Sequence, residues 1–278
     1  MDVKAYLQRI RCHRPVTPGP DHSSIDLPNI DFPNIDLPDR GRPRIDLLRA
    51  LHRAHLFTVP FENLDISLGR EIICDETRIL HKIVNEHRGG FCYELNGAFA
   101  ALLRALGFRV TLLSARVARE DGSHGPEFDH LTLRVDLEEP WLADVGFGEC
   151  FLEPLRLESR MEQLQNGHIY RLTSLNSEDG LLGLEAMVES RWKRQYAFTL
   201  QPRELSEFAG MCHYHQTSPE SHFTRQRICS LATPEGRVTL SDGKLIETRA
   251  GSRWERPLAG DEEWRVTLRE QFGVILPE

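Results

Sequence analysis

One of the six cysteines, Cys92, follows a pair of glycines and opens a stretch in which apolar residues recur at helical spacing. The glycines, Gly89 and Gly90, allow a sharp turn and a close approach of another molecule to the backbone. A cysteine in the first turn of a helix lies near unpaired amide donors and the positive end of the helix dipole, which favour thiolate over thiol. The alternative is a small apolar residue that packs a helix start. The pattern marks Cys92 as a candidate nucleophile.

A histidine and an aspartate further along the chain could serve such a thiol. His130 opens an alternating strand with Leu131 and Leu133 on its apolar face, so the imidazole is expected on the opposite face. Asp144 ends a short apolar strand, where its carboxylate needs a donor that an imidazole Nδ1–H would supply. A turn at Glu138-Glu139-Pro140 would place the two strands side by side. The residues alone leave open a surface or capping role for His130.

The elements that must position these residues change in type along the chain. Apolar residues first follow helical spacing, then alternate, and end in a mixture of both patterns. This order indicates an α+β architecture. Helices are expected over 2–10, from Ile45 to before Pro60, over 76–86, from Cys92 to before Gly107 and over 262–272; strands are expected over 109–117, 130–137, 141–145, 168–172, 197–200, 237–240 and 244–248.

The composition is that of a globular protein with an acidic balance. Of its 278 residues, 40% are hydrophobic and 27% are charged, and the formal net charge is −8. This balance argues against nucleic acid as the main partner, because phosphate binding needs a basic face. The N-terminus lacks the pattern of a signal peptide, and no run of about 18 apolar residues occurs. We therefore expect a cytoplasmic protein without a membrane partner.

The cysteines are scattered and form no CxxC pairs, so free thiols are expected in a reducing compartment. Two groupings could in principle bind a metal, namely His52 with His55 and the run from Cys212 to His215. Neither has a matching second pair of ligands, and no metal is predicted.

A proline-rich segment at about 17–43 holds a pentapeptide repeated three times, Ile-Asp-Leu/Phe-Pro-Asn/Asp. Proline at every fifth position prevents a helix or a central strand from running through it. An extended arm or insertion is the favoured interpretation, and a docking motif for a partner is the alternative.

Several segments together resemble the arylamine N-acetyltransferases. The resemblance extends over most of 2–12 and 44–278, and the proline-rich segment departs from it. The matching segments are RGGFCYELN (88–96), LGF (106–108), PFENL (60–64), the strand that begins at His130, DVGFG (144–148), YAFTL (196–200), QTSPES (216–221) and CSLATPEG (229–236).

This resemblance implies that Cys92 is an acyl-accepting nucleophile, His130 its base and Asp144 the acid that orients the base. It implies acetyl-CoA as the donor and arylamines, arylhydrazines or hydrazides as acceptors. Phe61 and Phe147 would line the acceptor pocket. In the mechanism that we expect, Cys92 and His130 exist largely as thiolate and imidazolium.

The resemblance also implies a helical bundle, a central antiparallel β-barrel and a C-terminal α/β lid. We expect these units at 1–112, 113–205 and 206–278. Because the chain has no P-loop or GxGxxG, its CoA site would have to be built from other loops. Gly89, Gly90, Tyr214 and Thr217 are the candidate CoA contacts, and ordinary loop roles are equally open for them.

Three other functions stay open at this point. An amide synthase of the same architecture would use the same triad on a carrier-bound polyketide acyl group. A hydrolase or transglutaminase also carries Cys, His and Asp in this order, and a non-catalytic binding module is the third possibility. The sequence leaves open the natural acceptor, the preferred acyl group and the oligomeric state.

Overall fold

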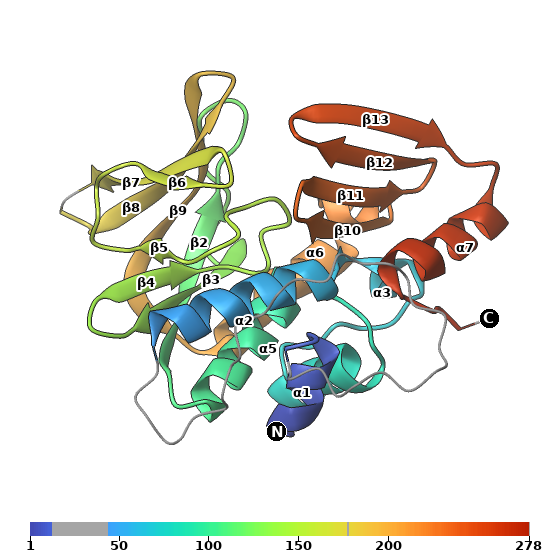
Figure 1. The fold of residues 1–278 in the computed structure, drawn as a ribbon, viewed down its shortest axis with the longest axis horizontal. Coiled ribbons are helices and arrows are strands. Elements are labelled where there is room, and N and C mark those ends of the chain that lie inside the picture. Colours follow the sequence, from blue (N-terminus) through green and yellow to red (C-terminus); the bar gives the residue numbers. More distant parts are fainter. Residues whose placement is uncertain (13–43, 177, 278) are drawn as a thin grey trace.

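The computed structural model describes residues 1–12, 44–176 and 178–277, and the predicted proline-rich insertion at 17–43 lies outside them. The described residues form a group of helices, a large antiparallel sheet that curls into a nearly closed barrel, and a separate smaller sheet (Figure 1). The predicted α+β architecture is confirmed. The helices are α1 (Val3–Arg9), α2 (Ile45–Thr58), α3 (Leu64–Ser67), α4 (Glu76–Leu80), α5 (Cys92–Ala105), α6 (Ala209–Thr217) and α7 (Asp261–Phe272), with shorter turns η1 (His81–Asn85), η2 (Leu205–Phe208) and η3 (His222–Thr224).

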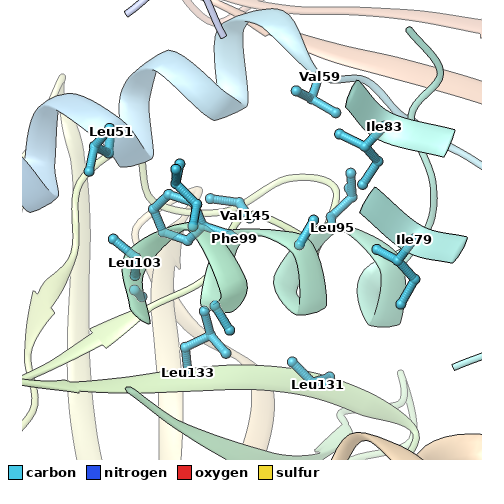
Figure 2. Close-up of a cluster of buried hydrophobic side chains, with 14 of the residues drawn as sticks. Leu51, Val59, Ile79, Ile83, Leu95, Phe99, Leu103, Leu131, Leu133 and Val145 are labelled. Atoms are coloured by element: carbon cyan, nitrogen blue, oxygen red, sulfur yellow. The ribbon is translucent and has the colours of Figure 1, made fainter. Parts of the chain in front are cut away.

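Helix α5 lies at the centre of the largest hydrophobic cluster. Every residue from Cys92 to Leu103 is buried, as expected for a core helix that is covered on all sides. Figure 2 shows the helix between Leu51 of α2 on one side and Leu131 and Leu133 of the barrel on the other. Burial of this helix fixes the position of Cys92 at its first residue.

The barrel sheet holds the strands that carry His130 and lead to Asp144. β3 and β4 pair in antiparallel fashion, with Leu133 opposite Ala143 and Val135 opposite Trp141. The predicted pairing of the two strands is confirmed. The strand order is β5 (Leu155–Arg156), β4 (Pro140–Ala143), β3 (His130–Asp136), β2 (Arg109–Val117), β9 (Arg191–Arg203), β8 (Leu181–Val188), β7 (His168–Asn176) and β6 (Gln163–Gln165).

The smaller sheet packs one face against α7, through the side chains of Trp264 and Leu268. Its first strand, β1, comes from the N-terminal part of the chain and pairs Phe61 with Ser230. The division of the chain into three units at 112 and 205 stays a prediction. β1 belongs to the first predicted unit but is a strand in the sheet of the third. The strand order is β1 (Phe61–Glu62), β10 (Ile228–Thr233), β11 (Gly236–Ser241), β12 (Lys244–Arg249) and β13 (Ser252–Pro257).

The helix predicted over 76–86 is present, but its second half is not a regular α-helix. The α-helix ends at Leu80 and continues as the wider π-helical turn η1, where the Glu86 N–H donates to the carbonyl of His81 at 3.1 Å. This turn carries Lys82, whose buried ammonium reaches Asp65 at 2.8 Å and Glu94 at 2.7 Å. The ion pairs give a physical reason for the local departure from α-helical spacing.

All six cysteines are free thiols, as predicted. Among the helices of the described ranges, none has both the length and the apolar character needed to cross a membrane.

Candidate active site

The turn before Cys92 is held by contacts within the chain. The Phe91 N–H donates to the Glu94 carboxylate at 3.1 Å, which caps the start of α5. A side chain on Gly90 would approach that carboxylate to 2.6 Å, and one on Gly89 would approach the Pro60 carbonyl to 1.9 Å. Both glycines are buried. Their close packing explains them without a ligand and does not support the prediction that they contact CoA.

The Cys92 thiol is buried, with 4% of the residue exposed. Burial is the largest influence and raises the pKa of Cys92 well above its ordinary value. A hydrogen bond from the Leu131 backbone lowers this pKa, whereas the charges of Asp144 and Asp129 raise it. Burial therefore opposes the influence of the helix start on the thiol, and the thiolate–imidazolium state expected for Cys92 and His130 stays a prediction. Ionisation of Cys92 requires a base that takes its proton.

His130 and Asp144 form a direct, buried pair. His130 Nε2 lies 2.6 Å from Asp144 Oδ2, and the two side chains are 3% and 0% exposed. The structure brings these predicted residues together, but through the other ring nitrogen, because Nδ1 was expected to face the acid. Nδ1 is thereby left as the ring nitrogen for proton exchange with a thiol. The imidazole shares the inner face of the barrel with Tyr196, at 5.2 Å between ring centroids.

The Asp144 carboxylate is held by further donors besides His130. Oδ1 accepts from Asn96 Nδ2 at 2.9 Å and from the Gly146 N–H at 3.0 Å. Oδ2 also accepts from the Tyr196 hydroxyl at 3.0 Å. Burial alone would raise the pKa of Asp144, but the charge of His130 and the hydrogen bonds from His130, Asn96 and Gly146 bring it below its ordinary value. The acid is therefore ionised and fixed in direction.

Asn96 joins the nucleophile helix to the strands of the proposed base and acid. Its Nδ2 donates to the Leu131 carbonyl at 2.6 Å as well as to Asp144, and its Oδ1 accepts from the Val145 N–H at 2.9 Å. Asn96 lies one helical turn after Cys92, so both residues face the same strands. Gly146 packs on this helix so closely that a side chain there would approach the Cys92 Cα to 2.8 Å. These contacts bring the start of α5, the start of β3 and the end of β4 to one place.

Sequence reasoning missed the supporting roles of Asn96, Tyr196 and His52. The position of Asn96 one turn after the cysteine was a usable signal. The sequence held no such signal for Tyr196 and His52, because they reach Asp144 from segments 52 and 92 residues away in the chain.

His52, as a neutral imidazole, binds the backbone of Asp144. Its Nε2 accepts from the Asp144 N–H at 3.1 Å, so Nδ1 carries the proton and donates to the Leu152 carbonyl at 2.9 Å. Burial, the main cause, lowers the pKa of His52 to about 4. A metal role for this histidine is excluded by these two hydrogen bonds, which use both ring nitrogens.

This buried histidine predicts a dependence of stability on pH. The unfolded chain takes up a proton at His52 near its ordinary pKa of 6.5, whereas the folded chain does so only near 4. The free energy of unfolding should therefore fall by about 1.4 kcal/mol per pH unit on account of His52 as the pH drops between these values. Chemical denaturation of wild type and His52→Gln should show a shallower fall in the variant. Equal slopes of stability against pH in wild type and His52→Gln would contradict the assignment of this pH dependence to His52. His168→Gln, at an exposed position, is the matched control and should keep the wild-type slope.

The two predicted substrate residues lie at different places. Phe147 is half-buried, with its ring 5.1 Å from that of His130 in an edge-on arrangement. Phe61 lies on β1, with its ring 6.0 Å from that of Phe223, which in turn lies 5.7 Å from Phe91. Phe147 thus contacts the proposed base directly, and Phe61 reaches the nucleophile turn through Phe223.

The predicted CoA contacts on α6 are both exposed residues. Tyr214 is 40% exposed, and the Thr217 hydroxyl donates to the His213 carbonyl one turn earlier at 2.8 Å. Within the described ranges, no three His, Cys, Asp or Glu side chains lie together in a way that could hold a metal ion.

The arrangement combines the parts needed for covalent acyl transfer. A buried thiol begins a helix whose first amides have no helical acceptor, and these amides could stabilise an oxyanion. A histidine held by an ionised acid lies at the start of the strand packed against that helix. Such a set can deprotonate a thiol and later take a proton from a second substrate.

Comparison with known proteins agrees with this chemistry. A family model described as N-acetyltransferase matches residues 44–278. The arylamine N-acetyltransferase of Escherichia coli (strain K12) is 36% identical over 234 residues, which cover 83% of this chain and 82% of that protein. The structure of arylamine N-acetyltransferase from Salmonella typhimurium matches with a TM-score of 0.84 and 31% identity, covering 99% of this chain and 92% of that one. The structure of the Mycobacterium marinum enzyme in complex with CoA matches with a TM-score of 0.80 and 29% identity, covering 98% and 93%.

Proposed function

Because this chain belongs to the arylamine N-acetyltransferase family of acyltransferases, we propose that it acetylates arylamines, arylhydrazines or hydrazides with acetyl-CoA through an acetyl-Cys92 intermediate. The 2.6 Å pair of His130 and Asp144 beside the start of α5 is the observation that carries the proposal. Acetyl-CoA as the donor is supported by the related structure that contains CoA.

In the first half-reaction, His130 takes the proton of the Cys92 thiol and the sulfur attacks the thioester carbonyl carbon. The bond between that carbon and the CoA sulfur then breaks, and CoA leaves with the proton that His130 held. The negative charge of Asp144 stabilises the imidazolium in between. The burial that raises the pKa of Cys92 makes this transfer to His130 necessary.

In the second half-reaction, the amine nitrogen attacks the acetyl carbon of acetyl-Cys92. His130 takes a proton from the nitrogen, the bond from carbon to the Cys92 sulfur breaks, and the sulfur recovers a proton. The reaction is therefore of the ping-pong type, with CoA released before the amine product. We propose that Phe147, which contacts His130, and Phe61 line the acceptor site, and that Tyr214 and Thr217 contact CoA.

Acetyl-CoA without an acceptor should leave one acetyl group on the peptide that holds Cys92. Mass spectrometry of the digest gives the position of the label, and an added arylamine should remove it. Cys92→Ser should lose the label, whereas Cys74→Ser, which changes another thiol of the same hydrophobic cluster, should keep it. Label on another residue with an unmodified Cys92 would overturn the proposed mechanism.

A further inference from the structure

Tyr93, the residue after Cys92, binds the chain just before His130 through its hydroxyl. The side chain is completely buried in the largest hydrophobic cluster. Its hydroxyl donates to the Phe128 carbonyl at 2.7 Å and lies 3.3 Å from the Asp129 carbonyl oxygen. A buried tyrosine hydroxyl needs such a partner, because no water is there to replace it. The neighbour of the proposed nucleophile is therefore tied to the two residues before the proposed base.

Asn96 holds the chain on the other side of His130 from the same helix. Its Nδ2 donates to the Leu131 carbonyl at 2.6 Å. Tyr93 and Asn96 lie three positions apart, which places them on one face of α5 in neighbouring turns. Together they bind backbone carbonyls before and after His130. The position of the proposed base is thus set by side chains of the helix that begins with Cys92.

Phe128 has a left-handed backbone, with φ at +65°. A bulky residue rarely adopts this conformation, which persists only where the surrounding contacts hold it. Its N–H donates to Ser114 Oγ of β2 at 2.7 Å, and its ring packs edge-on against Phe208 at 5.1 Å between centroids. The Arg203 guanidinium lies 4.9 Å from the centre of the same ring. The bond from the Tyr93 hydroxyl to the Phe128 carbonyl adds a contact from the nucleophile helix.

The turn at Phe128 determines how the chain enters β3. His130 follows two residues later and pairs with Ala115 of β2. A change of φ at Phe128 would rotate the entry of the strand and move the imidazole, which lies 2.6 Å from Asp144. A displacement of about 1 Å in a reacting group is enough to slow a reaction strongly. The strained turn therefore stands between the Tyr93 hydroxyl and the geometry of the proposed base.

We propose that Tyr93 is a positioning residue whose hydroxyl holds the left-handed turn at Phe128 and thereby aligns His130 with the Cys92 thiol. The proposal rests on the proposed roles of Cys92 and His130 in acetyl transfer. Because the Tyr93 side chain is completely buried, it acts through the backbone and not by contact with a substrate.

Tyr93→Phe tests the proposal, because it removes the hydroxyl and keeps the ring that packs against Phe91 and Phe208. We expect the release of CoA from acetyl-CoA in a single turnover to slow by about three- to tenfold, the effect of one lost hydrogen bond on a rate. Alkylation of Cys92 by iodoacetamide at pH 7, followed by mass spectrometry, should slow by a similar factor. The acetyl-CoA concentration that half-saturates the single-turnover rate should stay within about twofold of wild type, since no substrate contact is lost.

Tyr6→Phe is the matched control. Tyr6 is completely buried in the same cluster, and its hydroxyl lies 3.1 Å from His55 Nε2. Each variant loses one buried hydroxyl, so the two Tm values should fall by similar amounts, but Tyr6→Phe should keep both wild-type rates. Equal slowing in the two variants would reflect a general loosening of the core and would overturn the proposal. Rates within twofold of wild type in Tyr93→Phe would overturn it as well.

Ser114→Ala loosens the same turn from β2 and covers a Tyr93→Phe protein that fails to fold. It removes the acceptor of the Phe128 N–H, so alkylation of Cys92 should again slow, and an unchanged rate would overturn the proposal. Alkylation needs no acetyl group. A wild-type protein that releases no CoA would therefore refute the proposed acetyl transfer, whereas the alkylation rates would still decide the role of Tyr93.

Discussion

Replacing Asp144 by asparagine should lower kcat by about 10⁴-fold, the loss seen when the orienting acid of a Ser-His-Asp enzyme becomes an amide. The fold should be retained, because asparagine has nearly the same size and shape. Formation of acetyl-Cys92 from acetyl-CoA, followed as CoA release, is the measurement, and it should slow by a similar factor.

The reason lies in the donors around the carboxylate. Each oxygen of Asp144 accepts at least two hydrogen bonds, Oδ1 from Asn96 and Gly146 and Oδ2 from His130 and Tyr196. An asparagine must point its NH₂ group at one of these pairs of donors. If the NH₂ group faces His130, the imidazole must turn an unprotonated nitrogen toward it. The imidazole proton then stays on Nδ1, which is the nitrogen that should accept the thiol proton. If it faces Asn96 and Gly146, two buried donors lose their acceptor.

Tyr196→Phe is the matched control, since it removes one hydrogen bond from the same oxygen and leaves the charge. We expect it to lower kcat by less than about tenfold, because one neutral donor is worth about 1 kcal/mol. An Asp144→Asn variant with more than a tenth of the wild-type kcat would show that Asp144 does not orient the base.

Local patterns were sufficient for the elements that carry the proposed nucleophile and base. The helical spacing of the large apolar residues after Cys92 predicted α5, and the alternation after His130 predicted β3, because each pattern repeats within a single segment. The pairing of β3 with β4 also followed from the chain, since only a short turn separates them. These features depend on residues close in sequence.

The contacts that turn these elements into a site depend on distant residues. His52 and Tyr196 reach Asp144 from α2 and β9, and no local pattern marks such a contact. The choice of Nε2 over Nδ1 depends on the angle at which the imidazole leaves β3, which spacing does not encode. The thiolate of Cys92 was predicted from the helix start and from its pairing with His130, whereas the burial that opposes it comes from residues of several elements.

Strand β8 shows the same limit for the fold. Its sequence, Leu181–Val188, holds leucine, glutamate, alanine and methionine, which favour helices in isolation. It becomes a strand because β7 and β9 pair with it on both sides. Tertiary context overrides the local preference there.

Replacing Lys82 by methionine should lower the free energy of unfolding by about 3–5 kcal/mol, the cost of removing one partner from a buried ion pair. The ammonium of Lys82 lies 2.8 Å from Asp65, 2.7 Å from Glu94 and 3.9 Å from Glu62. Arg88 is the other cation of this cluster and binds Glu62 and Asp65. Two cations thus balance three carboxylates, and the loss of one of the cations leaves a large excess of buried negative charge.

The pKa values of the cluster agree with a tight balance. Burial alone would lower the pKa of Lys82, but the charges of Glu94, Glu62 and Asp65 raise it above its ordinary value. Burial raises the pKa of Glu94 to about 7 despite the charge of Lys82. Without Lys82, the Glu94 carboxylate would have to bind a proton or lie buried without its partner.

Chemical denaturation measures the loss, with Arg253→Met as the control for an exposed pair. Arg253 and Glu255 are 59% and 39% exposed, and breaking their contact should leave the free energy of unfolding nearly unchanged, because solvent screens an exposed pair. A loss in Lys82→Met as small as that of the control would contradict the role of the cluster.

The double variant Lys82→Met, Glu94→Gln separates charge balance from packing. It removes one charge of each sign, so it should be more stable than Lys82→Met alone, although the methionine is the same. A double variant less stable than the single one would mean that Lys82 acts through packing of its stem. Because Glu94 also caps the helix at Phe91, the cluster that stabilises the fold also holds the turn that presents Cys92.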